Sequence, residues 1–207
     1  MDSYNQKYDQ RQEEDGTRPT RLAFDVRWRP FQLNPSLPTG RGLDKMQYYY
    51  DRFGGPSRVD GMIRQMKAVG RDVGIDFSYG GRVADTLDSH RLIWYARERG
   101  GGELQDRMVE ELFRAYFTQE KSLGEREVLV ECAAAVGLDV ADVLAADDGS
   151  AGSGVGTREV QEEMEAYARR WNCRGVPLFV IDDKYPLGGS QPPEAFLKVF
   201  DDLEESN

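Results

Sequence analysis

The chain has 207 residues, of which 37 are acidic and 27 are basic, and its formal net charge at neutral pH is −10. This length suits one large domain or a small domain with an insertion. The charge argues against nucleic acid as a partner, because nucleic-acid-binding proteins carry a basic footprint. No apolar run approaches the roughly 20 residues that cross a bilayer, so no membrane partner is expected either.

The first 21 residues are polar and predict a frayed or helical tail. They contain no hydrophobic stretch typical of a secretory signal. The two cysteines, Cys132 and Cys173, lie far apart and form no Cys-x-x-Cys pair. Cys132 falls on the apolar face of a predicted helix, which favours a buried and inert thiol. We therefore expect a reduced, cytoplasmic protein.

Residues 22–28 alternate between apolar and polar side chains, which predicts a half-buried strand ending at Pro30. A long stretch with helical periodicity follows. The helices predicted in this stretch cover residues 44–53, 57–73, 86–99, 104–118, 125–136 and 140–145.

After a Gly- and Ser-rich loop, the sequence predicts a helix over 157–171, strands over 178–181 and 185–187, and a last helix beginning at Pro192 and Pro193. This order indicates an α/β domain interrupted by an all-helical insertion. The predicted organisation is a polar tail over 1–21, a core formed by 22–41 with 172–204, and an insertion over 42–171.

The Gly175-Val176-Pro177 step opens the apolar strand 178–181. Proline is tolerated at the first residue of a strand, although not at its centre, because it donates no ladder hydrogen bond. The cis isomer of an X-Pro bond lies only about 0.5–1 kcal/mol above the trans isomer. Taken alone, the pair is compatible with either isomer.

Four stretches, in this order, resemble the DsbA-like branch of the thioredoxin superfamily, in particular the group of 2-hydroxychromene-2-carboxylate isomerases and polyketide-associated dithiol oxidoreductases. They are residues 26–35 (VRWRPFQLNP), 85–93 (DTLDSHRLI), 112–117 (LFRAYF), and 175–181 (GVPLFVI) with 189–191 (GSQ). The resemblance covers roughly residues 22 to 204. It implies a thioredoxin-like α/β fold with a large all-helical insertion and a cis bond before Pro177.

The sequence departs from this family at its start. Members begin with a buried strand followed by Cys-x-x-Cys, or by a single Ser or Cys, at a helix N-terminus, where free N–H groups stabilise a thiolate or a bound glutathione sulfur. No residue before Leu22 can fill that role, and residues 4–20 resemble the tail of the helix that would follow. We hypothesise that the first central strand is missing and that the chain is N-terminally incomplete, which would leave unpaired edges on strands 22–28 and 178–181.

The resemblance also implies a substrate-binding surface. In relatives, the backbone at Val176 and Pro177 docks a peptide or glutathione, much as an added strand would. Ser190 and Gln191 precede the last helix, whose N-terminal N–H groups can hold a carboxylate; the alternative is that Ser190 only caps the helix. Arg91 could bind an acidic ligand, or it could be solvated or ion-paired.

No catalytic residue is identified. His90, the only histidine, and Cys173 are the candidates. An imidazole titrates near neutral pH and can act as an acid or base, but it can equally be a hydrogen-bonded structural group. Nothing in the sequence places a base or a helix N-terminus beside Cys173. No metal site and no cofactor are predicted, with glutathione considered as a cosubstrate.

These observations predict a member of the DsbA-like thiol–disulfide oxidoreductase family that is inactive as written. Its reactive cysteine would then be supplied by residues outside this sequence. The alternative is a non-catalytic module that binds glutathione or a peptide, and a third interpretation is a fragment that does not fold stably. The expected partners are a thiol or disulfide peptide, or glutathione.

Overall fold

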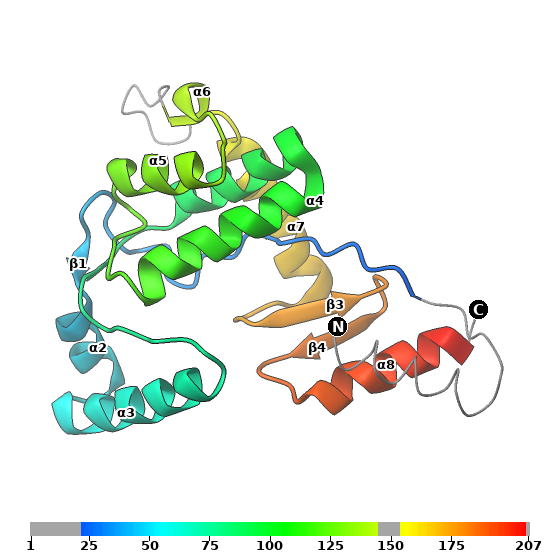
Figure 1. Ribbon diagram of the computed structural model, residues 1–207, viewed down its shortest axis with the longest axis horizontal. Coiled ribbons are helices and arrows are strands. Elements are labelled where there is room, and N and C mark those ends of the chain that lie inside the picture. The colour runs from blue at the N-terminus through cyan, green and yellow to red at the C-terminus, as the bar shows by residue number, and fades with distance from the viewer. Residues whose placement is uncertain (1–21, 145–153, 206–207) are drawn as a thin grey trace. The chain divides into compact units, whose positions relative to one another are not determined.

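The computed structural model describes residues 22–144 and 154–205 (Figure 1). The described chain forms two compact units, one made of residues 22–25 with 167–205 and the other of residues 26–166. Residues 1–21, for which the sequence predicts a tail, lie outside the described part. The sequence predicts boundaries between core and insertion after residue 41 and after residue 171. The two units divide the chain at other positions, and the predicted boundaries stay a prediction.

The larger unit is helical. After a two-residue strand β1 (Leu43–Asp44) come α2 (Lys45–Phe53) and α3 (Pro56–Asp72). The Asp44 side chain caps α2 by accepting a hydrogen bond from the Gln47 N–H at 2.9 Å. The second short strand, β2 (Arg82–Val83), pairs antiparallel with β1. The sequence did not predict this ladder, because two residues are too few to show a period.

Helices α4 to α6 form the core of this unit. α4 (Leu87–Phe117) is interrupted at Gly100 and Gly101, which have non-helical backbone angles, so the break predicted between residues 99 and 104 is confirmed. α5 (Arg126–Ala135) packs along α4, and α6 (Ala141–Leu144) contacts α4 as well. Their apolar faces meet in one cluster. Its most completely buried members are Leu92, Ala96, Met108, Leu129, Ala133 and Val143.

The smaller unit contains the hairpin of β3 (Leu178–Ile181) and β4 (Tyr185–Gly188), followed by α8 (Pro193–Glu205). The end of α7 (Thr157–Trp171) also belongs to it. Two edge-to-face ring pairs, each with centroids 5.0 Å apart, join neighbouring segments to one side of α8. They are Phe179 with Phe196, and Phe24 with Phe200, one helical turn further along.

The prediction of a strand over 22–28 is wrong. These residues are extended but belong to no strand, because no described strand lies beside them to complete a ladder. At Trp28 the side chain of Gln105 takes the place of a neighbouring strand. Its Oε1 accepts from the Trp28 N–H and its Nε2 donates to the Trp28 carbonyl, each at 3.1 Å. The alternating pattern thus predicted the extended backbone correctly, but it does not determine whether a second strand lies alongside.

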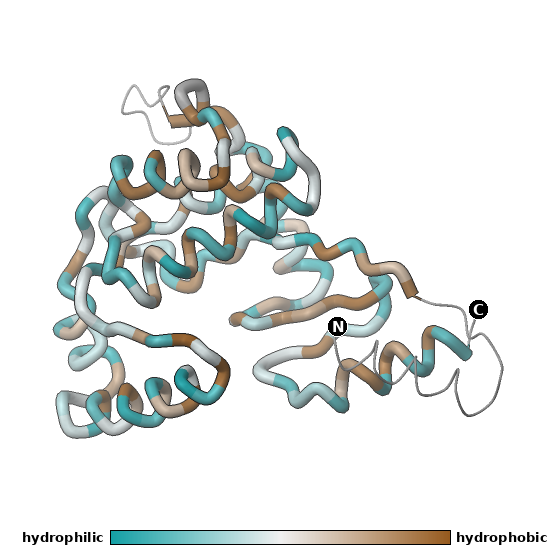
Figure 2. Tube along the Cα trace, viewed as in Figure 1, coloured by the Kyte–Doolittle hydropathy of each residue, from teal (hydrophilic) through white to brown (hydrophobic). Residues whose placement is uncertain are grey.

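Strand β3 has the sequence Leu-Phe-Val-Ile, and Figure 2 shows it as a hydrophobic run. Such a run is typical of a strand that is covered on both faces. None of its four residues is fully buried, and Phe179 is exposed. In the described part of the chain β3 pairs only with β4, so its other edge carries free backbone groups.

Candidate functional site

The Val176–Pro177 step lies directly before β3, and its peptide bond is cis. The Val176 side chain is 54% exposed and Pro177 is exposed too. Within the described residues, no strand pairs with the other edge of β3. The cis isomer agrees with the resemblance.

A hydrogen bond joins the two predicted parts of the binding surface. The Gly189 N–H donates to the Pro177 carbonyl at 2.9 Å, extending the β3–β4 register by one residue beyond the Leu178–Gly188 pair. This bond places Ser190 and Gln191 beside the Val176–Pro177 step. The structure therefore brings together all four residues predicted to bind substrate in this unit.

The loop before α8 differs from the expectation in one respect. The helix begins at Pro193, so Pro192 rather than Ser190 immediately precedes it. Ser190 is exposed, and Gln191 Nε2 donates to the Gly188 carbonyl at 2.6 Å. The interpretation of Ser190 as the helix cap is thus not what the structure favours.

Cys173 lies in the same unit, two residues beyond the end of α7. Its backbone N–H donates to the Ala168 carbonyl at 3.2 Å, and its half-buried thiol donates to the Gly175 carbonyl at 3.3 Å. A nucleophilic cysteine typically lies at a helix N-terminus or beside a basic group, whereas Cys173 follows the C-terminal end of a helix and contacts a carbonyl. The surroundings of Cys173 are therefore unlike those of a nucleophilic cysteine.

Cys132, by contrast, is inside the helical core of the larger unit. Only 2% of its surface is exposed, as its place on the apolar face of α5 predicts. Burial is the main cause that raises the pKa of its thiol to about 11, and the nearby Glu111 carboxylate acts in the same direction. This thiol stays protonated at neutral pH and is chemically inert.

His90 is partly buried on α4. Its Nε2 is 3.1 Å from the Phe31 carbonyl, so the ring donates there as the neutral Nε2–H tautomer. Desolvation lowers the pKa of His90, while the Phe31 carbonyl and the Asp85 carboxylate act in the opposite direction. These contacts match the structural alternative, in which His90 holds the segment at Phe31 against α4. An acid–base role stays a prediction.

His90 also lines a cavity of about 200 Å³ in the larger unit. Its walls combine two indole rings with charged groups of both signs, and the Arg29–Glu163 ion pair lies among them. The lining residues are Arg27, Trp28, Arg29, Pro30, His90, Ile93, Trp94, Arg97, Glu98, Gln105 and Glu163. None of the residues predicted to bind substrate lines this cavity.

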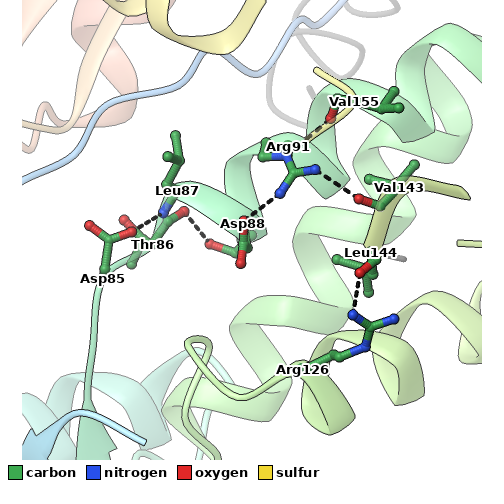
Figure 3. A network of polar contacts seen from close by, with 10 residues as sticks. Asp85, Thr86, Leu87, Asp88, Arg91, Arg126, Val143, Leu144 and Val155 are labelled. Carbon is green, nitrogen blue, oxygen red and sulfur yellow. Dashed lines mark hydrogen bonds and ion pairs between the residues drawn. The ribbon is translucent and has the colours of Figure 1, made fainter. Parts of the chain in front are cut away.

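Arg91 is 2% exposed, and three groups of the described residues hold it (Figure 3). Its guanidinium donates to the Val143 and Val155 carbonyls at 2.7 and 3.0 Å and forms an ion pair with Asp88 at 2.7 Å. These contacts tie α4 to the end of α6 and to the segment before α7. The geometry favours the ion-paired alternative over a ligand-binding role, because the fork of the guanidinium is already occupied.

No feature of the sequence pointed to Lys45, the first residue of α2. Its side chain is only 1% exposed, and its Nζ lies 3.8 Å from the centroid of the Tyr116 ring. A lysine among charged and polar neighbours in the sequence is normally a surface residue. Only the fold, which places Tyr116 over it, makes this lysine unusual.

Three features together define a thioredoxin-like α/β protein. They are the exposed Val-Pro step before a β-hairpin, the helix that follows the hairpin, and the helical unit inserted earlier in the chain. A model of the DSBA-like thioredoxin domain matches residues 4–201. The chain therefore belongs to the DsbA-like thioredoxin family, which is a family of thiol–disulfide oxidoreductases. The predicted fold class is confirmed.

The structure is similar to the crystal structure of a probable DsbA oxidoreductase from Streptomyces coelicolor. The two share 26% sequence identity with a TM-score of 0.71, and the match covers 83% of this chain and 71% of the other. Among curated protein sequences, none matches the chain. In the part of the chain that the structure describes, no helix combines the length and apolarity needed to span a membrane.

Proposed function

We propose that the chain is a DsbA-like module that binds glutathione or a cysteine-containing peptide and does not itself turn over disulfides. The ligand would lie along Val176 and Pro177 as an extended strand, with a carboxylate near Ser190 and Gln191. The observation that supports this most directly is the hydrogen bond from Gly189 to Pro177, which joins the two halves of the surface.

The chemistry of the candidate ligand suits this surface. An extended peptide backbone offers N–H and C=O groups to a free strand edge. The Ser190 hydroxyl and the Gln191 amide can donate hydrogen bonds to a carboxylate, and exposed apolar side chains at Val176 and Phe179 can cover a cysteinyl side chain. Glutathione combines all three groups in one small molecule.

We expect no turnover, because neither of the two thiols of this sequence is placed to take part in thiol–disulfide exchange. Thiol–disulfide exchange requires a thiolate as the attacking species. The Cys132 thiol is shielded in the core with its pKa raised to about 11. The Cys173 thiol lies at a helix C-terminus and donates to a carbonyl. We expect no reduction of insulin disulfides above the level of the Cys173→Ser variant; catalytic reduction that disappears in that variant would contradict this half of the proposal.

Binding is tested separately by calorimetric titration of oxidised and reduced glutathione into the wild type and a Ser190→Ala/Gln191→Ala variant. Removing two hydrogen-bonding side chains should weaken binding about tenfold, at about 0.5–1.5 kcal/mol for each bond. Lys184→Ala is a matched control, because Lys184 is exposed in the turn at the opposite end of the same hairpin. Equal affinity in the wild type and the double variant would refute the site.

A further inference from the structure

Lys45 is buried at the junction of α2, α4 and the β1–β2 ladder. Its backbone N–H donates to the Gly81 carbonyl at 3.1 Å, and only 1% of the residue is exposed. Lysine is almost never fully buried unless its charge is paired. As the first residue of α2, it also lies at the helix end where a positive charge is unfavourable.

The Nζ atom has few partners for a charged group. It donates one hydrogen bond, to the Tyr116 carbonyl at 3.3 Å, and lies 3.8 Å from the centroid of the Tyr116 ring. Among the described residues it forms no ion pair within 4 Å. A protonated ammonium has three donors to satisfy, whereas a neutral amine loses much less when it is buried with a single partner.

The titratable groups around Lys45 come from several elements. Glu120, which follows α4, attracts the charged form, although its carboxylate accepts hydrogen bonds from Ser78 and from the Gly80 N–H. Lys67 of α3 acts on the same carboxylate. Burial is the dominant influence and lowers the pKa of Lys45 to about 8.

Two tyrosines complete these surroundings. The hydroxyl groups of Tyr49 on α2 and Tyr116 on α4 interact with each other, and burial raises the pKa of both. Both hydroxyls are therefore uncharged throughout the range in which Lys45 titrates, and they offer no negative charge to it. Among the described residues, Glu120 is the charged neighbour that favours the ammonium, and the face of the Tyr116 ring attracts it as well.

We propose that Lys45 is a proton-sensitive joint, which holds α2 against α4 as a neutral amine and weakens this attachment when it takes up a proton. In the neutral form the amine donates to the Tyr116 carbonyl and packs on its ring. In the protonated form the uncompensated charge favours an outward position near Glu120 and water. The device is internal to the helical unit and independent of the substrate surface.

The direction of the pH effect follows from the two pKa values. In the folded chain the pKa of Lys45 is about 8, against 10.5 for an exposed lysine. Between these values the unfolded chain binds more protons, so the stability of the fold increases as pH rises. From about pH 7.5 to 9, the equilibrium constant for unfolding should fall roughly eightfold through this group alone.

The test compares denaturant unfolding of the full chain at these two pH values for the wild type, Lys45→Met and the control Lys198→Met, which changes an exposed lysine on α8. The shared contributions of other groups, including the raised pKa of Cys132, cancel in the comparison. We expect the roughly eightfold effect in the wild type and in Lys198→Met relative to Lys45→Met. Equal pH dependence in all three proteins would overturn the proposal.

If Lys45→Met does not fold, an NMR titration of the wild type tests the proposal instead. The sequence contains six lysines, so their side-chain Cε resonances can be followed individually in a pH titration of the wild type. One resonance, absent from a Lys45→Arg sample, should titrate near pH 8 together with amide signals of α2. If every lysine titrates near its ordinary value, or if the α2 amides show no such midpoint, the joint does not exist.

Discussion

Replacing Arg91 with methionine should destabilise the protein by about 2–3 kcal/mol, because the change removes a buried guanidinium that donates to two carbonyls and pairs with the partly exposed Asp88. The variant deprives the Val143 and Val155 carbonyls of their donor and leaves Asp88 without its cation. Because α6 has only four residues, it depends on such contacts for its position. Urea unfolding followed by circular dichroism measures the loss.

Two further variants serve as controls for this measurement. Arg91→Lys keeps the charge but cannot reproduce the planar fork, so it should recover only part of the lost stability. Arg64→Met changes an exposed arginine on α3 and should alter the free energy of unfolding by less than about 0.5 kcal/mol. A wild-type free energy in Arg91→Met would show that the three contacts of Arg91 contribute nothing.

Gln105→Met should cost about 2–4 kcal/mol, since each buried polar group left without a partner costs about 1–3 kcal/mol. Gln105 is 2% exposed and bonds both backbone groups of Trp28, and its Oε1 also accepts from Arg97. Methionine is similar in length and keeps the core filled, so the effect reports the lost hydrogen bonds rather than a cavity.

The same measurement in Gln105→Glu separates the two bonds. Glutamate keeps an acceptor for the Trp28 N–H but loses the donor to the Trp28 carbonyl. It also buries a negative charge, although the Arg97 guanidinium lies 3.3 Å from the side-chain oxygen at this position. Gln65→Met, at an exposed position of α3, is the matched control. If Gln105→Met unfolds like this control, the side chain does not hold the extended segment.

The helices of this protein were largely predictable, because the spacing of their apolar residues agrees with the positions of their capping and helix-breaking residues. Asp44 caps α2, α3 begins at Pro56, one residue before its predicted start, and Gly100 with Gly101 interrupts α4 at the expected place. The failure at residues 22–28 has a different origin. Alternation is a local property, whereas a strand needs a neighbour, and the neighbour that pairs with Trp28 is the side chain of Gln105.

The candidate site was predictable only in part. Short motifs led to the prediction of Val176, Pro177, Ser190 and Gln191, and the Gly189 hydrogen bond joins these two motifs in the fold. Arg91 was ambiguous, because burial decides between a ligand-binding and an ion-paired arginine. Lys45 carried no local signal, because its unusual character comes from Tyr116, which is 71 positions away in the sequence.

The most direct measurement of the binding surface is a titration of the ¹⁵N-labelled chain with glutathione, followed by amide chemical shifts. We expect the largest shifts at Val176, Gly189, Ser190 and Gln191, with little change at Lys184 in the far turn of the hairpin. Shifts confined to residues around the His90 cavity, or no shifts at saturating glutathione, would contradict the assignment of this surface.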